Sequence, residues 1–353
     1  MKISGPAIFK LSFLLLILPA ITTGFLFAQG AETCAEKLDR AQTSFDRGLL
    51  GEVPGLLTGC LKSGFKKEEE LQAYKLLIQT YLLNDKVELA DSTMDAFLKR
   101  NPEYKTSPTD HSSFVYLYNK FNVKPVLMLG VRIGSNIPFL TFIDENLLAG
   151  SPGKSEYNTN ATNIYISADA KFRLSERMEL SFEGAYSTLK FTNIVSDTMS
   201  HATITYNEHQ QRIEIPVCIN YDIRSFGNFT LYARAGLGAA LNLSAKADIT
   251  NIPTDRNNRN DRTGETLDRK DSRISMDIFC QLGAGMKYKI PKGYLFAELR
   301  SSFGVLNQNV SGGTTVDIAE QLYRWSDPGF RMNAFNFNIG YTYIFYKPAK
   351  KEE

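Results

Sequence analysis

The residues best suited to catalysis lie close together in one polar stretch of the chain. Ser200, Glu208 and His209 offer a hydroxyl, a carboxylate and an imidazole, the three groups of a nucleophilic triad, and His201 lies near them. The remaining histidine is His111; no HExxH, GxSxG or phosphate-loop glycine pattern is present. A loop with a histidine and a few hydroxyls is more often solvated than catalytic. We therefore expect no enzyme and no catalytic residue.

Neither a metal nor a cofactor is expected elsewhere in the chain. The run Asp-Arg-Asn at 255–257 begins like a calcium-binding loop, but Arg259 and Asn260 occupy positions that need a ligand and a glycine. The mixed charges of 255–273 and the Tyr-Arg-Trp run at 323–325 offer contacts for a protein partner or for lipopolysaccharide phosphates. A solvated loop is the simpler interpretation of both.

Charged residues of both signs recur at alternate positions within apolar segments of the second half. The bases are Arg132, Lys171, Arg173, Arg212, Arg234, Lys287 and Arg300. The acids are Asp169, Glu179, Glu183, Glu214, Asp222, Asp277 and Glu298. Isolated charges in an enclosed interior are very costly, so we expect these side chains to pair there as a structural plug. A proton or small-ion path is the functional alternative.

Eight segments, seven of which carry these charges, alternate apolar and polar residues, which is the pattern of strands with two different faces. They are 127–134, 164–174, 178–187, 212–223, 229–242, 274–287, 294–305 and 335–345. Opposite parity places Cys218 and Cys280 on opposite faces, so we expect both to stay unpaired. An even number of strands, eight here, is typical of outer-membrane barrels.

The connections between the strands give a second indication. Those at 175–177, 224–228 and 291–293 are short, whereas those at 140–162, 193–205, 247–272 and 306–329 are long. Short periplasmic turns and longer outside loops are typical of outer-membrane barrels, and this order places both ends of the chain in the periplasm. A soluble antiparallel barrel or sandwich also alternates, and it is the alternative fold. The interior of an eight-stranded barrel is just wide enough for its own side chains.

The first part of the chain has a different period. Lys2 and Lys10 flank the start of an apolar run to residue 28, which predicts a secretory signal peptide; a retained anchor is the alternative. From 29 to 105 the apolar residues recur at helical spacing, in four helices that resemble two tetratricopeptide-type repeats. Cys34 and Cys60 fall at adjacent helix ends, so a disulfide is expected there after export. These helices form either a peptide-docking groove or a simple spacer.

A family resemblance rests on the order of several short motifs. Arg-Ile-Glu-Ile-Pro-Val at 212–217, Leu-Gly-Ala-Gly-Met-Lys-Tyr at 282–288 and the terminal run at 337–345 resemble the PorT-like, porin-family outer membrane protein beta-barrel domain. The resemblance covers about 124–347. It implies an integral outer-membrane protein of a Gram-negative bacterium without catalytic residues, and some relatives serve the type IX secretion machinery. The preceding helices and the Lys/Glu tail depart from the simplest members.

These observations predict an α+β multidomain chain, in which a small all-α domain precedes an eight-stranded antiparallel transmembrane β-barrel. The expected parts are the signal peptide 1–28, the periplasmic helical domain 29–105, the linker 106–123, the barrel 124–347 and the periplasmic tail 348–353. A net charge of +2 argues against nucleic acid as a partner. The partners expected are outer-membrane lipid and a periplasmic or envelope protein. The role expected is non-enzymatic anchoring, with a small-solute or ion channel as the alternative.

Overall fold

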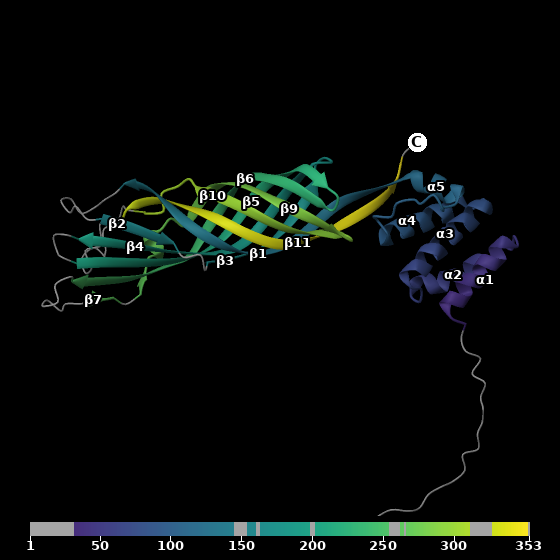
Figure 1. The fold of residues 1–353 in the computed structure, drawn as a ribbon, viewed down its shortest axis with the longest axis horizontal. Helices are drawn as coiled ribbons and strands as arrows, with labels where there is room; N and C mark the ends of the chain where they lie inside the picture. Colours follow the sequence, from purple (N-terminus) through teal and green to yellow (C-terminus); the bar gives the residue numbers. More distant parts are fainter. Residues whose placement is uncertain are drawn as a thin grey trace, which may run out of the picture. The chain divides into compact units, whose positions relative to one another are not determined.

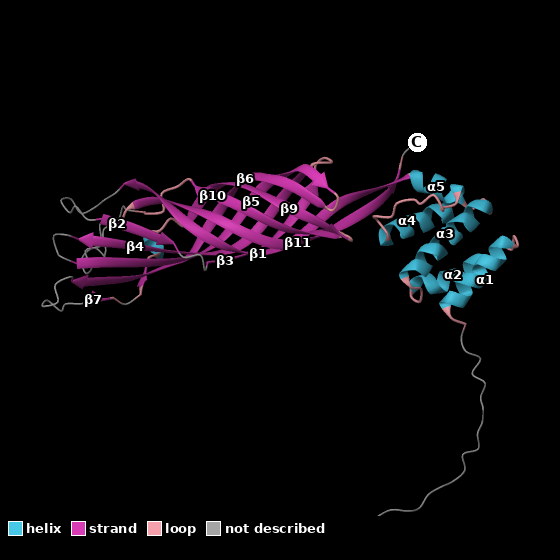
Figure 2. Ribbon diagram, viewed as in Figure 1, coloured by secondary structure: helices cyan, strands magenta, loops and turns pink. Residues whose placement is uncertain are grey.

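The computed structural model shows a helical part followed by strands (Figures 1 and 2). It describes residues 32–144, 154–159, 163–197, 202–253, 262–264, 266–310 and 327–351. The expected signal peptide lies outside these ranges. Two compact units divide the chain after Thr80, within the third helix, and each is described by itself below.

The first unit contains α1 (Cys34–Asp46), α2 (Val53–Lys62) and most of α3 (Lys67–Leu83). Helix α1 begins with a capping box, in which the Glu36 N–H donates to Thr33 Oγ1 at 3.3 Å and the Thr33 N–H donates to Glu36 Oε2 at 2.8 Å. The unit is small, and its cysteines are bonded to each other. A disulfide joins Cys34 to Cys60 across 26 residues of sequence, and a cross-link closing a loop of that length contributes roughly 3 kcal/mol.

The second unit begins with α4 (Val87–Arg100) and α5 (Ser112–Asn119). Helix α5 lies inside the range 106–123 that was expected to be a linker, so part of this connecting segment is helical. Aromatic packing explains the helix, because the Phe114 ring lies 5.6 Å from Phe97 and 6.2 Å from Tyr118. Among the described helices, none is both long and apolar enough to cross a bilayer.

Eight antiparallel strands of the described chain form a closed ring, as the sequence predicted (Figure 2). Each strand pairs with the next in the order β1, β3, β4, β5, β6, β9, β10, β11, and β11 pairs back with β1. Their bounds are β1 Phe121–Asp144, β3 Asn163–Arg173, β4 Met178–Asp197, β5 Ala202–Phe226, β6 Phe229–Pro253, β9 Met276–Ile290, β10 Gly293–Gly304 and β11 Gly329–Lys350.

Short additional elements extend the ring at its long-connection end. Strand β2 (Lys154–Thr159) pairs with β4, and β7 (Arg262–Thr263) and β8 (Leu267–Asp268) pair with β6. A 3₁₀ turn, η1 (Lys270–Ser272), follows β8. Part of each of two expected loops, 140–162 and 247–272, is therefore ordered strand.

The connection expected to be long at 193–205 is mostly strand. Strand β4 continues to Asp197 and β5 begins at Ala202, so the connection is 198–201, no longer than 174–177 between β3 and β4. The strict alternation of short and long connections is therefore wrong at this position. Apolar residues at every second position prolong the strands and pack together on their inner face, as described below.

The strands also extend further at the opposite end. Phe121 of β1 pairs with Lys350 of β11, so the pairing starts before residue 124 and runs beyond residue 347. The expected tail 348–353 is therefore strand as far as Lys350. This two-stranded extension lies beside α4, where Lys350 Nζ contacts Asp91 Oδ2 at 2.5 Å.

The ring has an apolar outer face and a polar inner face along its middle. On β5, Ile215 and Ile219 are 49% and 43% exposed, whereas Glu214 and Asn220, which alternate with them, are buried. The predicted parity of the cysteines is confirmed, because Cys218 is buried inside, Cys280 is exposed on the wall, and both are free thiols.

Candidate functional site

Glu183 on β4 is the centre of the buried charges inside the ring. Three arginines and two hydroxyl groups donate to its two carboxylate oxygens. They are Arg132 (2.6 Å), Arg234 (2.6 Å), Arg300 (3.1 Å), Tyr165 (2.7 Å) and Ser167 (2.7 Å). These donors come from β1, β3, β6 and β10, so one carboxylate ties four other strands of the ring to β4.

Two further acids balance the three arginines. Arg132 pairs with Asp169 at 2.8 Å and with Glu298 at 3.2 Å, and Arg300 also contacts Glu298. Three bases and three acids are thus almost completely removed from solvent in one neutral network. Small residues leave room for this charge network and for the aromatic side chains beside it. A Cβ added to Gly340, for example, would lie 2.4 Å from the aromatic ring of Phe296.

A second group of charges fills the short-turn end of the interior. Lys287 Nζ lies 3.0 Å from Glu179 and 2.7 Å from Asp222. Arg173, which is partly exposed, also pairs with Glu179 at 2.7 Å. Lys171 reaches from Asp169, at 3.3 Å, to the Tyr294 hydroxyl, at 3.0 Å, and so lies between this group and the Glu183 network.

Three of the charged residues predicted to face the interior do so without forming an ion pair with another described residue. The Arg212 guanidinium donates to Gln308 Oε1, and Gln308 Nε2 in turn donates to Asp277 at 2.7 Å. Glu214 accepts a hydrogen bond from the Ser187 hydroxyl at 2.6 Å. Twelve of the fourteen predicted interior charges are buried, whereas Arg173 and Asp222 are partly exposed at the short-turn end. Gln308 bridges Arg212 and Asp277.

A buried cluster that the sequence reasoning missed lies near the long connections. Arg273, completely buried, donates to Glu208 at 2.6 Å and contacts Asp327, and Asp327 also pairs with Arg269 at 2.7 Å. Through these ion pairs, the loop that follows β6 and the loop that follows β10 are both connected to Glu208 of β5. The parity of β5, continued from Arg212 back to Glu208, is the signal in the sequence that places Glu208 inside.

The candidate triad does not assemble in the described residues. Ser200 and His201 lie outside them. Glu208 points inward, whereas His209 is the next residue of the same strand and faces outward. The candidate calcium loop at 255–260 and the aromatic run at 323–325 also lie outside the described residues. Within those residues, no cluster of His, Cys, Asp or Glu has the arrangement of a metal site.

The inner face near the long connections is apolar. Its buried cluster combines side chains from β4, β5, β6 and β11. The larger members are Leu189, Phe191, Ile204, Tyr206, Ile249, Phe330 and Met332. The Arg273 guanidinium lies 5.2 Å above the Phe330 ring, so the apolar cluster and the buried ion cluster are in direct contact.

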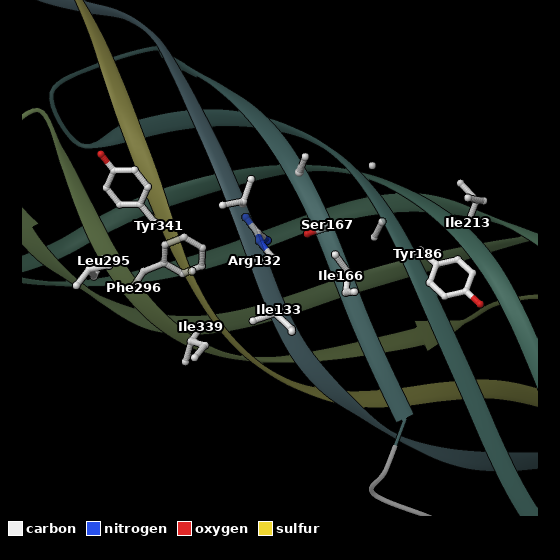
Figure 3. Close-up of a pocket in the computed structure, with 15 residues that line it drawn as sticks. Arg132, Ile133, Ile166, Ser167, Tyr186, Ile213, Leu295, Phe296, Ile339 and Tyr341 are labelled. Atoms are coloured by element: carbon white, nitrogen blue, oxygen red, sulfur yellow. The ribbon is translucent and has the colours of Figure 1, made fainter. Parts of the chain in front are cut away.

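Two hollows of very different size lie in the described part of the ring. A cavity of about 20 Å³, lined by Arg212, Glu214 and Asp277, lies between the charge networks, and that volume holds about one water molecule. The much larger hollow in Figure 3, about 1020 Å³, is lined mostly by apolar side chains, including the exposed Ile133 and Ile166 of the outer wall, and also by the buried Arg132 and Phe296.

A separate contact attaches the segment after α4 to the short-turn end of the ring. Glu103 accepts hydrogen bonds from the Lys292 backbone N–H and from the Tyr346 hydroxyl, both at 3.1 Å, and Lys289 lies 3.2 Å away. Burial raises the pKa of Glu103, but these hydrogen bonds and the Lys289 charge outweigh it, so the net pKa is below its ordinary value.

This lowered pKa predicts a pH-dependent attachment. A carboxyl whose pKa is depressed on folding stabilises the folded form above its unfolded pKa, near 4.5, and the contribution is lost as the pH falls through the lower, folded value. Amide hydrogen exchange around residue 103 should therefore be slow and constant from pH 7 to 5 after correction for intrinsic rates, and should accelerate below about pH 4.5. The Glu103→Gln variant should show no such transition; a transition that persisted in it would contradict this origin.

A closed antiparallel ring, apolar outside and filled with polar side chains inside, is the architecture of a membrane-spanning β-barrel. The chain belongs to the outer membrane protein beta-barrel domain family, whose model matches residues 122–308. No match was found among curated proteins.

Solved structures with similar folds are also outer-membrane barrels, at low similarity. Neisserial surface protein A is 10% identical with a TM-score of 0.33, covering 64% of this chain and 99% of that one. The outer membrane protease OmpT from Escherichia coli is 10% identical with a TM-score of 0.39, covering 64% and 98%. OprG from Pseudomonas aeruginosa is 8% identical with a TM-score of 0.28, covering 63% and 97%. These likenesses are too distant to transfer a function.

Proposed function

We propose that this protein is a closed, non-enzymatic outer-membrane anchor that holds a periplasmic or envelope protein through its N-terminal helices. The filled interior is the observation that supports a closed barrel. Buried ion pairs join its strands, and the cavity between the networks has room for about one water molecule. A conducting pore needs a continuous wet path, so the small cavity and the buried ion pairs around it support a closed barrel in preference to a channel.

The lengths of the connections support an orientation of the barrel. Short turns face the periplasm in barrels of this kind, and the turns at 174–177, 227–228 and 291–292 lie at the end of the ring next to α4 and α5, so these helices would be periplasmic. The expected disulfide is consistent with an oxidising periplasm. Tetratricopeptide-type character would give these helices a peptide-docking role. The PorT-like resemblance supports a component of an envelope or secretion assembly.

Planar-bilayer recording of the purified protein tests the closed barrel against a channel. The wild type should show no stable open level in concentrated KCl. A variant with both Arg132→Ala and Glu183→Ala, which removes two interior side chains of opposite charge, shows whether the assay detects an emptied lumen; it should conduct more if it still migrates as a folded barrel. Stable openings of the wild type would favour the channel and refute the closed barrel.

A further inference from the structure

The outer face of the barrel changes from apolar to polar at one register across three neighbouring strands. Tyr186 of β4, Ile213 of β5 and Leu241 of β6 are paired side by side and form an apolar row, beyond which β6 adds the exposed Leu243. The next outward paired row is Thr188, Gln211 and Ser244. The apolar outer face of β5 runs for eleven residues, from Ile223 to Ile213, which fits the roughly 9–11 residues of a tilted transmembrane strand.

The inner face changes in the opposite sense at the same place. On the short-turn side of the Gln211 row, the inward residues of these strands include Arg212 and Glu214. On the long-connection side they include Leu189, Ile204 and Ile249 of the apolar cluster, together with the buried polar Glu208 and Gln210. A register shift in the β5–β6 pairing between Gln211 and Arg212 marks the change. A strand pair that is polar outside and packed with apolar residues inside is suited to water, so these strands leave the hydrocarbon at this row.

The next outward row beyond this boundary is basic. Lys190 of β4 is paired with His209 of β5, and His209 is paired with Lys246 of β6. Both lysines are exposed, and neither has an ion-pair partner among the described residues. Two residues of a tilted strand rise about 5 Å, and the headgroup layer is roughly 5–7 Å deep on each side. The row therefore lies at headgroup depth.

Two acids lie near the row, and the hydrogen bonds that they accept come from other groups. Asp268 is paired opposite Lys246 but accepts the Lys270 backbone N–H at 2.9 Å, and Asp248 accepts the Thr266 hydroxyl at 2.7 Å. His209 Nε2 is buried without a hydrogen-bond partner. Burial and the charges of the two lysines lower the pKa of His209. Like charges directly opposite each other in a sheet are unfavourable, so this row is complementary to an anion.

We propose that Lys190, His209 and Lys246 form a site for a phosphate group on the headgroup of an outer-leaflet glycolipid of the lipopolysaccharide type. The lysines supply the charge, and the imidazole between them supplies a hydrogen bond. The proposal rests on the orientation proposed above, because only the long-connection end faces the outer leaflet. Charge complementarity and headgroup depth select this occupant over a soluble protein.

Native mass spectrometry of the full chain, extracted from outer membranes in mild detergent, tests the site. The wild type should retain phosphorylated glycolipid, and the double variant Lys190→Gln with Lys246→Gln should retain about thirty-fold less, since each lysine near a charged surface contributes about fivefold. The matched control is Lys124→Gln with Lys347→Gln, which removes another exposed cross-strand lysine pair, at the opposite end of β1 and β11. This control should retain glycolipid as the wild type does.

Add-back experiments distinguish the sources of binding. Delipidated protein should regain the phosphorylated glycolipid but neither the same lipid without its phosphates nor inorganic phosphate alone at equal concentration. Equal retention in the wild type and the Lys190/Lys246 variant, or equal binding of the dephosphorylated lipid, would overturn the proposal.

The orientation of the barrel in the membrane is tested by an experiment that does not depend on lipid binding. An Asn207→Cys variant, one row beyond His209, should react with a membrane-impermeant thiol reagent on whole cells. Absence of labelling would refute the proposed orientation itself, whereas labelling without lipid selectivity would refute only the lipid site.

Discussion

Replacing Glu183 by glutamine is expected to destabilise the barrel by roughly 3–5 kcal/mol, because it leaves buried guanidinium groups without their shared counter-charge. Arg132, Arg234 and Arg300 all donate to this one carboxylate. Glutamine keeps the size of the side chain, so the loss is mainly electrostatic. Urea unfolding in detergent micelles, followed by the heat-modifiable migration of the folded barrel, measures the change in the free energy of unfolding.

The matched control is Glu176→Gln in the turn between β3 and β4. The Glu176 side chain is exposed, and its backbone carbonyl, which accepts the Arg173 guanidinium, is unchanged by the substitution. This variant should unfold within about 0.5 kcal/mol of the wild type, as surface substitutions do. Similar, small effects of both substitutions would show that the buried network contributes little to stability.

The strands of the barrel were predictable because period-two alternation persists wherever one face meets lipid. The prediction stopped too early at the long-connection end, where Lys190 and His209 make the outer face polar and the stretch resembles a loop. Alternation itself continues there with its sense inverted, through Leu189, Phe191 and Ile204 on the inner face. A search for alternation of either sense would have extended β4 and β5 to their observed ends.

The interior charges were predictable in position, while their partners were not. Parity places Glu183 and Arg300 inside, yet they are 117 residues apart in sequence and meet only because the ring closes at a particular stagger. Arg273 has no such parity signal, since it follows η1 and lies outside the strands. Its backbone is paired only through an isolated bridge to Asn309. Helix α5 was missed because Pro, Asp and Ser dominate the composition around it, while distant rings such as Phe97 stabilise it.

The second large effect is expected at the long-connection end. Replacing Arg273 by methionine leaves the Glu208 carboxylate buried without a guanidinium partner, and breaking such a pair costs roughly 3–5 kcal/mol. Arg273 also holds Asp327, so both connections should loosen while the Glu183 network is untouched. Limited proteolysis should cleave 254–275 and 305–328 faster, with little change in heat-modifiable migration. Arg331→Met, an exposed arginine on neighbouring β11, is the control and should cleave like the wild type.

A compensating substitution separates lost charge balance from lost packing. If the penalty of Arg273→Met arises from the uncompensated Glu208, then adding Glu208→Gln removes the buried charge and should recover most of the protease resistance. The Tyr206 hydroxyl and Gln210, which now donate to Glu208, can also bond to an amide. The stability could instead come from the packing of the Arg273 side chain over the Phe330 ring. In that case the double variant should be cleaved by protease as fast as the single variant. The recovery therefore measures how far electrostatic balance, as distinct from packing, holds the two connections over the barrel.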